Sequence, residues 1–187
     1  MTKVFVCAGT NLAENENINQ QARLLGKILS QRDDITYVQG GSAEGLMGET
    51  LKEFVKYSNN VEFYIPDKYY AYDSPKLIKV VGEENYHAFK TNGEAGRLEV
   101  IKSCDEIIVL PGGIGTLEEL LYCNETGRAN EHNNRITVVN IDGYYDGLLK
   151  QISTNIEQGL TKNSAIKFEV IDNVNKLDFL NHDQLTM

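Results

Sequence analysis

Long apolar runs are absent from this sequence. No stretch approaches the roughly 18 consecutive apolar residues of a membrane-spanning helix. Met1, Thr2 and Lys3 lead directly into the apolar run 4–6, without the longer apolar core of a signal peptide. We therefore expect a cytoplasmic protein without a membrane partner.

Cysteine and histidine are scarce, with three residues of each type. They are Cys7, Cys104, Cys123, His87, His132 and His182. The cysteines are odd in number and lack CxxC spacing, and the histidines form no HxxxH or HExxH pair. The sequence therefore indicates buried thiols rather than disulfides, and we expect neither a metal nor a cofactor.

An excess of basic residues is also missing. Lys and Arg total 18 against 27 Asp and Glu, which gives a formal net charge of −9. Non-specific nucleic-acid binding needs a basic surface, so we expect no nucleic-acid partner. The apolar content of 41% is ordinary, and 187 residues with 3 prolines and no internal repeat or linker predict one domain over 1–187.

Apolar periodicity alternates between strand and helix along the chain. The expected strands are 3–8, 35–39, 61–65, 107–110 and 136–141, and the expected helices lie around 18–29, 47–55, 95–103, 116–127 and 148–156. Residues 67–93 show no clean period and predict loop and short helix, and 170–180 predicts an edge strand and a terminal helix. Short strands that are apolar on both faces predict a Rossmann-like α/β fold, with a parallel sheet and helices on both faces.

The segment PGGIGTLEE, residues 111–119, lies where a buried strand ends and a helix begins. Gly112, Gly113 and Gly115 leave the backbone N–H groups open to an anion beside the helix N-terminus, and the Thr116 hydroxyl can add a hydrogen bond. Alternatively the glycines only make a tight turn, Thr116 caps the helix and Glu119 closes a capping box.

A second glycine-rich segment, GGSAEGLMG at 40–48, also follows an apolar strand and opens a helix. Two such turns at one sheet edge favour a ligand that carries phosphate. Neither turn is followed by the Lys-Ser or Lys-Thr of a P-loop, and neither fits the dinucleotide-binding GxGxxG pattern. ATP hydrolysis and dinucleotide redox chemistry are therefore disfavoured.

Together these segments resemble the Lonely Guy family of cytokinin-activating phosphoribohydrolases, whose members are often labelled lysine decarboxylases. The family pattern PGGxGTxxE is complete at 111–119, and the pattern GGGxxGLMG matches 40–48 except for Ser42. The segment NIDGYYD at 140–146 is similar to the family's NVDGYYD. The likeness covers nearly the whole chain, from Gly9 and Thr10 to the helix after Tyr145.

This resemblance implies hydrolysis of a nucleoside 5'-monophosphate, such as AMP or an N6-modified AMP, into a free base and ribose 5-phosphate, and it implies a homodimer. Cleavage builds positive charge on the ribose, so a carboxylate at the anomeric carbon is needed, and we assign it to Glu119. The nucleotide-binding residues that we expect are Gly9, Thr10, Gly40, Gly41, Met47, Gly112, Gly113, Gly115 and Thr116.

The sequence departs from the family at an arginine that contacts the substrate, 15 residues before the proline of PGG. Gly96 stands at that position, and Arg97 follows it. We assign the catalytic arginine to Arg97 if the helix start is shifted, and Arg128 is the other cation that can replace it. Plain surface exposure of Arg128 is the simpler interpretation.

Other functions are consistent with parts of the pattern. A carrier of a nucleotide or cofactor would use the same glycine turns without cleavage, and a nucleoside deoxyribosyltransferase would also need a carboxylate. Lys90 and Lys102 are candidates for a Schiff-base decarboxylase, but nothing in the sequence marks a pyridoxal partner. Four tyrosines are candidates either for stacking on a base or for an oligomer interface: Tyr69, Tyr70, Tyr72 and Tyr86.

Overall fold

Seven parallel strands form one sheet in this computed structural model, which describes residues 1–177. The strand order is β4-β3-β2-β1-β5-β6-β7. The strands are β1 Thr2–Cys7, β2 Ile35–Gln39, β3 Val61–Pro66, β4 Ala88–Thr91, β5 Glu106–Val109, β6 Arg135–Val139 and β7 Phe168–Ile171. The predicted Rossmann-like parallel sheet is therefore confirmed.

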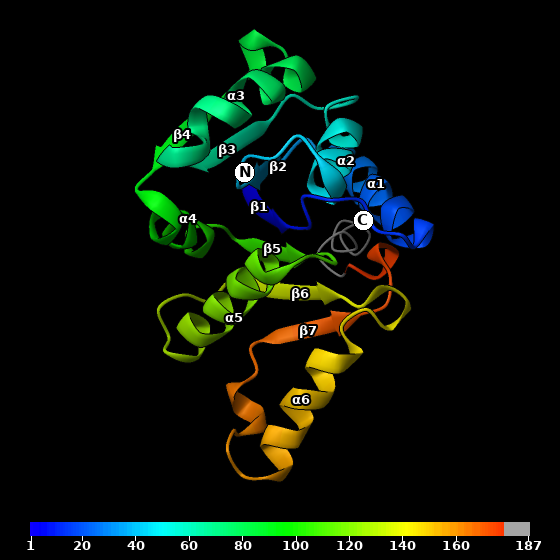
Figure 1. Ribbon diagram of the computed structural model, residues 1–187, viewed down its shortest axis with the longest axis vertical. Helices are drawn as coiled ribbons and strands as arrows, with labels where there is room; N and C mark the ends of the chain where they lie inside the picture. The colour runs from blue at the N-terminus through cyan, green and yellow to red at the C-terminus, as the bar shows by residue number, and fades with distance from the viewer. Residues whose placement is uncertain (178–187) are drawn as a thin grey trace, which may run out of the picture.

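Within residues 1–177, six α-helices connect the strands and cover the sheet on both faces. They are α1 Glu16–Ser30, α2 Gly45–Phe54, α3 Asp67–Val81, α4 Gly93–Lys102, α5 Ile114–Arg128 and α6 Asp146–Glu157. In Figure 1, α4 and α5 lie on the left of β1 and β5, whereas α1 and α2 lie on the right. No helix in the described part of the chain is long and apolar enough to cross a membrane.

Side chains along β1 point alternately to the two faces of the sheet and pack against the helices on each face. Val4 and Val6 pack with α1 and α2 in one buried cluster, whereas Phe5 and Cys7 pack with α4 and α5 in the other. Both faces of this central strand are fully buried, as expected for a parallel sheet covered by helices. The three cysteines are buried free thiols, which confirms that prediction.

The prediction for residues 67–93 was wrong. This segment contains α3, which is 15 residues long, a short 3-10 helix and the edge strand β4. The buried stripe of α3 is sparse, because it consists of Ser74, Leu77 and Val81. Apolar spacing does not predict this helix, because one residue of the buried stripe is polar and Pro75 lies inside the helix.

The C-terminal prediction is partly tested. Strand β7 pairs with β6 and forms the edge of the sheet, as predicted. A 3-10 helix at Val174–Lys176 follows it. The rest of the predicted terminal helix, 178–180, lies outside the described residues.

The strand order reverses between β1 and β5, which are neighbours although α1 to α4 separate them in the chain. In parallel α/β sheets such a reversal opens a crevice at the carboxyl ends of the two strands, where ligands bind. The loops that leave β1 and β5 carry Gly9 and Thr10 on one side and residues 111–113 on the other. The topology therefore brings these two segments to one place.

Candidate functional site

The loops after β1 and β5 are joined by backbone hydrogen bonds. Gly9 N donates to Pro111 O at 3.0 Å, and Met47 N donates to Gly9 O at 3.1 Å. The second glycine-rich segment meets the same loop, because a Cβ at Gly45 would lie 2.1 Å from the backbone of Thr10. The positive φ of 62° at Gly45 and this close approach both require glycine there.

Helix α5 starts with free N–H groups at this crevice. Its N-cap is Gly113, which provides no side-chain cap, and its first turn contains no acidic residue. The first N–H groups of a helix have no intrahelical partner and attract anions. The alternative that Thr116 caps the helix and Glu119 closes a capping box is therefore wrong, because the N-cap is Gly113 and the helix starts at Ile114, two residues before Thr116.

Thr116 is buried, and its hydroxyl points toward Gly112. A Cβ at position 112 would lie 2.1 Å from Thr116 Oγ1. At positions 113 and 115 no atom of the described residues lies within 4 Å of an added Cβ, so the open sides of these glycines face empty space. The three glycines of the segment thus have different roles. Gly112 leaves space for the Thr116 side chain, and the other two leave the helix N-terminus accessible.

Glu119 lies one turn further into α5, and only 2% of it is exposed. Burial raises the pKa of its carboxyl group, which the nearby Arg97 and a hydrogen bond from Cys7 partly oppose. Its neighbour Glu118 is exposed at the mouth of the crevice. The helix therefore places one carboxylate inside the site and one at its edge.

Arg97 reaches from α4 to this carboxylate. Its Nη1 lies 3.1 Å from Glu119 Oε1, and its Nη2 lies 3.0 Å from Glu94 Oε2. Neither contact has hydrogen-bond geometry, so Glu119 Oε1, Glu94 Oε2 and Arg97 Nε are buried without a hydrogen-bond partner within residues 1–177. Buried polar atoms normally have a partner, and unpaired ones often mark a place for a ligand or water.

The local backbone explains why Arg97, and not position 96, faces the site. Helix α4 begins at Gly93, and a Cβ at Gly96 would face Thr91 at 3.2 Å. A Cβ at Gly40, at the end of β2, would lie 3.1 Å from Arg97 Cδ. Gly40 therefore gives room to the arginine, and Arg128 lies elsewhere, where it pairs with Glu125 at the end of α5.

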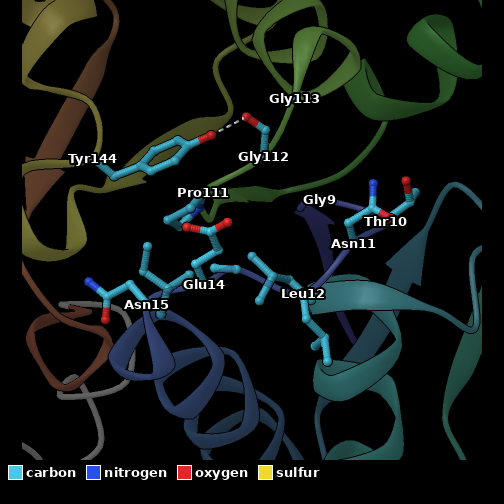
Figure 2. A pocket seen from close by; sticks show the side chains of 13 residues that line it. Gly9, Thr10, Asn11, Leu12, Glu14, Asn15, Pro111, Gly112, Gly113 and Tyr144 are labelled. Carbon is cyan, nitrogen blue, oxygen red and sulfur yellow. Dashed lines mark hydrogen bonds between the residues drawn. The ribbon is translucent and has the colours of Figure 1, made fainter.

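The crevice contains three adjoining pockets. Most of the predicted site residues line a central pocket of about 230 Å³, formed by Ala8, Gly9, Thr10, Met47, Arg97, Gly113, Ile114, Gly115, Thr116 and Glu119. Gly40 and Gly41 line a tyrosine pocket of about 470 Å³ together with Tyr69, Tyr72, Asp73 and Glu94. Gly112 lines an outer pocket of about 390 Å³ between Leu12, Glu14 and Tyr144, which Figure 2 shows.

The tyrosines of the irregular segment divide into two pairs. Tyr69 and Tyr72 are exposed on α3 and line the tyrosine pocket, whereas Tyr70 and Tyr86 pack against the apolar core. The pocket also has an acidic rim. Sequence reasoning missed the rim residues Asp73 and Glu94. It noted Tyr144 only within the segment at 140–146 and gave it no role in the site, because no motif spacing marks a contact between distant segments.

Lys90 and Lys102, the candidates for the disfavoured Schiff-base chemistry, lie outside these pockets. Hydrogen bonds to Glu99 and Glu131 raise the pKa of Lys102, and a Schiff-base lysine needs the opposite shift. Lys90 lies over the Tyr70 ring at 4.6 Å. Among residues 1–177 no group of three or more His, Cys, Asp or Glu side chains is arranged to hold a metal ion.

Comparison with known proteins gives consistent matches. Residues 40–178 match the family model described as possible lysine decarboxylase. The chain is 30% identical over 177 residues to a probable cytokinin riboside 5'-monophosphate phosphoribohydrolase of Oryza sativa subsp. japonica. The alignment covers 93% of this chain and 74% of that protein. The chain is 31% identical to a cytokinin riboside 5'-monophosphate phosphoribohydrolase of Arabidopsis thaliana, over 87% of this chain and 73% of that protein.

Solved structures share the fold at lower identity. The molybdenum cofactor binding protein of Rippkaea orientalis superposes with a TM-score of 0.66 at 18% identity, over 99% of this chain and 98% of that one. The Moco carrier protein of Chlamydomonas reinhardtii gives a TM-score of 0.63 at 14% identity, over 98% and 96%. At these identities the likeness shows the fold alone.

Proposed function

This chain belongs to the Lonely Guy family, whose model carries the description possible lysine decarboxylase, and from that membership we propose that it hydrolyses the N-glycosidic bond of a nucleoside 5'-monophosphate. The products are a free base and ribose 5-phosphate. The observation that carries the proposal is the ion pair between the partly buried Arg97 and the buried Glu119 beside the open N-terminus of α5. The site thus joins the open helix N-terminus to a carboxylate that is ion-paired but has one oxygen without a hydrogen-bond donor among residues 1–177.

The 5'-phosphate is placed on the first turn of α5. The N–H groups from Gly113 to Thr116 and the positive end of the helix dipole provide the attraction, although the whole chain carries a charge of −9. Gly115 has no atom near its open side, so a phosphate oxygen can approach the backbone closely. Thr10, on the facing loop, completes the wall of the same pocket.

The ribose then lies across the central pocket with its anomeric carbon at Glu119. In the reaction the C–N bond breaks, its electron pair leaves with the base, and the oxygen of a water molecule bonds to the anomeric carbon. Glu119 stabilises the positive charge on the ribose and accepts the water proton, which then passes to the departing base and leaves it as the neutral free base. Arg97 pairs with both Glu94 and Glu119, and Lys68 also pairs with Glu94, so the two carboxylates and two cations of this cluster balance and Glu119 is the carboxylate placed at the anomeric carbon.

The base is placed in the tyrosine pocket. This pocket shares Arg97, Thr10, Met47 and Gly115 with the central pocket, whereas the outer pocket contains neither Arg97 nor Glu119. A base attached at the catalytic carbon must therefore extend toward Tyr69 and Tyr72. The acidic rim of this pocket favours a base that donates hydrogen bonds, such as the exocyclic amino group of adenine.

A homodimer is part of the same proposal. Ile114 at the start of α5 is 82% exposed, and Leu121 on the same helix is also exposed, although both are large apolar side chains. Exposed apolar side chains that lie together are typical of protein–protein interfaces. A cytoplasmic location stays a prediction from the sequence.

The test is to incubate the purified protein with AMP, other nucleoside monophosphates and N6-isopentenyl AMP, and to follow base and ribose 5-phosphate by chromatography. AMP and IMP form a matched pair, because they differ at the exocyclic group of the base, and AMP should be the better substrate. Tight binding without product would overturn the enzyme and favour a carrier. Exchange of one base for another without free sugar phosphate would favour a deoxyribosyltransferase.

A further inference from the structure

Three consecutive carbonyl groups of the loop after β5 are each held by a donor from outside it. Leu110 O accepts from Tyr145 Oη at 2.7 Å, Pro111 O accepts from Gly9 N at 3.0 Å, and Gly112 O accepts from Tyr144 Oη at 2.7 Å. Figure 2 shows Tyr144 reaching across the outer pocket to Gly112. The orientation of every peptide plane in this loop is therefore fixed by a contact with another segment.

The bond from Tyr144 determines the direction of one N–H group. In a trans peptide the carbonyl of residue 112 and the N–H of residue 113 point in opposite directions, and the chain contains no cis peptide within the described residues. Holding Gly112 O toward Tyr144 thus directs Gly113 N–H away from that hydroxyl, and Gly113 lies where the outer and the central pocket meet. A peptide between two glycines flips readily, because neither residue has a Cβ to restrict its dihedral angles.

Tyr144 is itself held in place from a third segment. Asn15 and Asn17, at the start of α1, both donate to Asp142 Oδ2 at 2.9 Å, and Asp142 has a φ of 50°. The rings of Tyr144 and Tyr145 pack edge to face with centroids 4.9 Å apart. These contacts fix the turn that carries Tyr144, although the tyrosine ring is half exposed.

We propose that Tyr144 is a positioning residue for the phosphate, whose hydroxyl keeps the Gly112–Gly113 peptide in the orientation that presents an N–H donor to the 5'-phosphate. This inference rests on the proposed function, because it assumes that phosphate binds at α5. A flipped peptide would present a carbonyl oxygen instead, which repels phosphate. Tyr144 therefore contributes to affinity for the phosphate group and not to affinity for the base.

The neighbouring tyrosine provides a matched control. Tyr145 donates to Leu110 O, but the peptide between residues 110 and 111 has no N–H group, since residue 111 is proline. Tyr145→Phe removes the same hydroxyl from the adjacent ring and leaves a buried carbonyl unpaired. It should lower the melting temperature without changing phosphate affinity in the folded protein.

The experiment measures the Kd of ribose 5-phosphate and of adenine by calorimetry for the full-length wild type, Tyr144→Phe and Tyr145→Phe. We expect Tyr144→Phe to weaken ribose 5-phosphate about tenfold or more, as loss of a hydrogen bond to a charged group does. Adenine affinity should stay unchanged. Gly113→Pro deletes the N–H directly at a φ of −83°, and adding Tyr144→Phe to it should then cause no further loss.

Each outcome decides a different point. If the wild type does not bind ribose 5-phosphate, the proposed function fails and this inference fails with it. If the wild type binds it and Tyr144→Phe binds it equally well, only the inference is overturned. Equal weakening of ribose 5-phosphate and adenine in Tyr144→Phe would also overturn it, because that pattern indicates general loss of structure.

Discussion

The Arg97 guanidinium lies 3.1 Å from the Glu119 carboxylate, although the two residues belong to different helices and Glu119 is almost completely buried. Removing both charges from water is costly, and such a pair seldom increases stability over apolar residues of similar volume. Its position at the end of β1, beside the open start of α5, favours a functional reason for the pair over a structural one.

Glu119→Gln should lower hydrolysis by at least about a hundredfold and preserve nucleotide binding. The amide keeps the shape of the side chain but cannot stabilise positive charge or accept a proton from water. Single-turnover kinetics with AMP and binding of ribose 5-phosphate separate the two effects.

Glu125→Gln is the matched control for that variant. Glu125 is an exposed carboxylate on the same helix and pairs only with Arg128 among the contacts of the described residues, so hydrolysis should be unchanged. Near-normal hydrolysis by Glu119→Gln would show that the reaction uses another group.

Arg97→Met should reduce kcat/KM by about a hundredfold and move the acid limb of its pH profile to higher pH. Burial already raises the pKa of the Glu119 carboxyl, and Arg97 opposes that shift. Without the cation the pKa rises further, so a smaller fraction is ionised at a given pH. The profile is measured from pH 4.5 to 9 at saturating and low substrate.

Arg128→Met tests whether any arginine loss has this effect. Arg128 is exposed and pairs with Glu125, outside the crevice. Its pH profile should match that of the wild type. A shift of the acid limb in Arg128→Met, or none in Arg97→Met, would contradict the assignment.

The elements that a sequence reading predicts well are those whose cause is local. The buried strands around Val4, Ile35 and Ile107 and the strand-to-helix turn at 111–116 follow from apolar runs and glycine. The direction of Arg97 does not, because it depends on where α4 begins and on the room left by Gly40.

The same limit applies to the rest of the site. The helical period of α3 is hidden by Ser74 and Pro75 in its sequence. The contact between Tyr144 and Gly112 joins residues 32 positions apart, and no local pattern encodes it. A sequence reading therefore identifies the turn that carries the chemistry but not the side chains that hold it in place.

Glu106→Gln should stabilise the protein above pH 7 and have little effect at pH 4. Burial raises the pKa of Glu106 to about 7, and Arg135 only partly opposes this. The folded state therefore holds the proton more tightly than the unfolded state, whose pKa is about 4.3. The stability that protonated Glu106 contributes to the wild type is lost as the pH rises from about 4.3 to about 7. Glutamine does not ionise, so the variant avoids this loss.

Melting temperatures at several pH values provide the measurement. A gain of about 2–4 °C at pH 8 corresponds to about 1 kcal/mol for a chain of this size. An equal gain at pH 4 would contradict the prediction, because Glu106 is then protonated in the folded state and mostly protonated in the unfolded state.

The two glycines that flank the start of α5 should respond oppositely to alanine. Gly112→Ala places a methyl group 2.1 Å from Thr116 Oγ1, so the turn must shift and the protein should lose about 1–3 kcal/mol of stability. Gly115→Ala meets no atom within 4 Å and lies in a helix, where alanine is favoured over glycine by about 1 kcal/mol. Its melting temperature should therefore rise.

For Gly115→Ala, affinity for ribose 5-phosphate and stability should change in opposite directions. The methyl group of Gly115→Ala occupies the open side of the central pocket, where the phosphate is placed, so affinity for ribose 5-phosphate should fall although the protein is more stable. Thermal melts with and without ribose 5-phosphate measure both effects in one series. If Gly115→Ala binds ribose 5-phosphate as tightly as the wild type, the phosphate does not lie against this turn, and its placement on α5 is wrong.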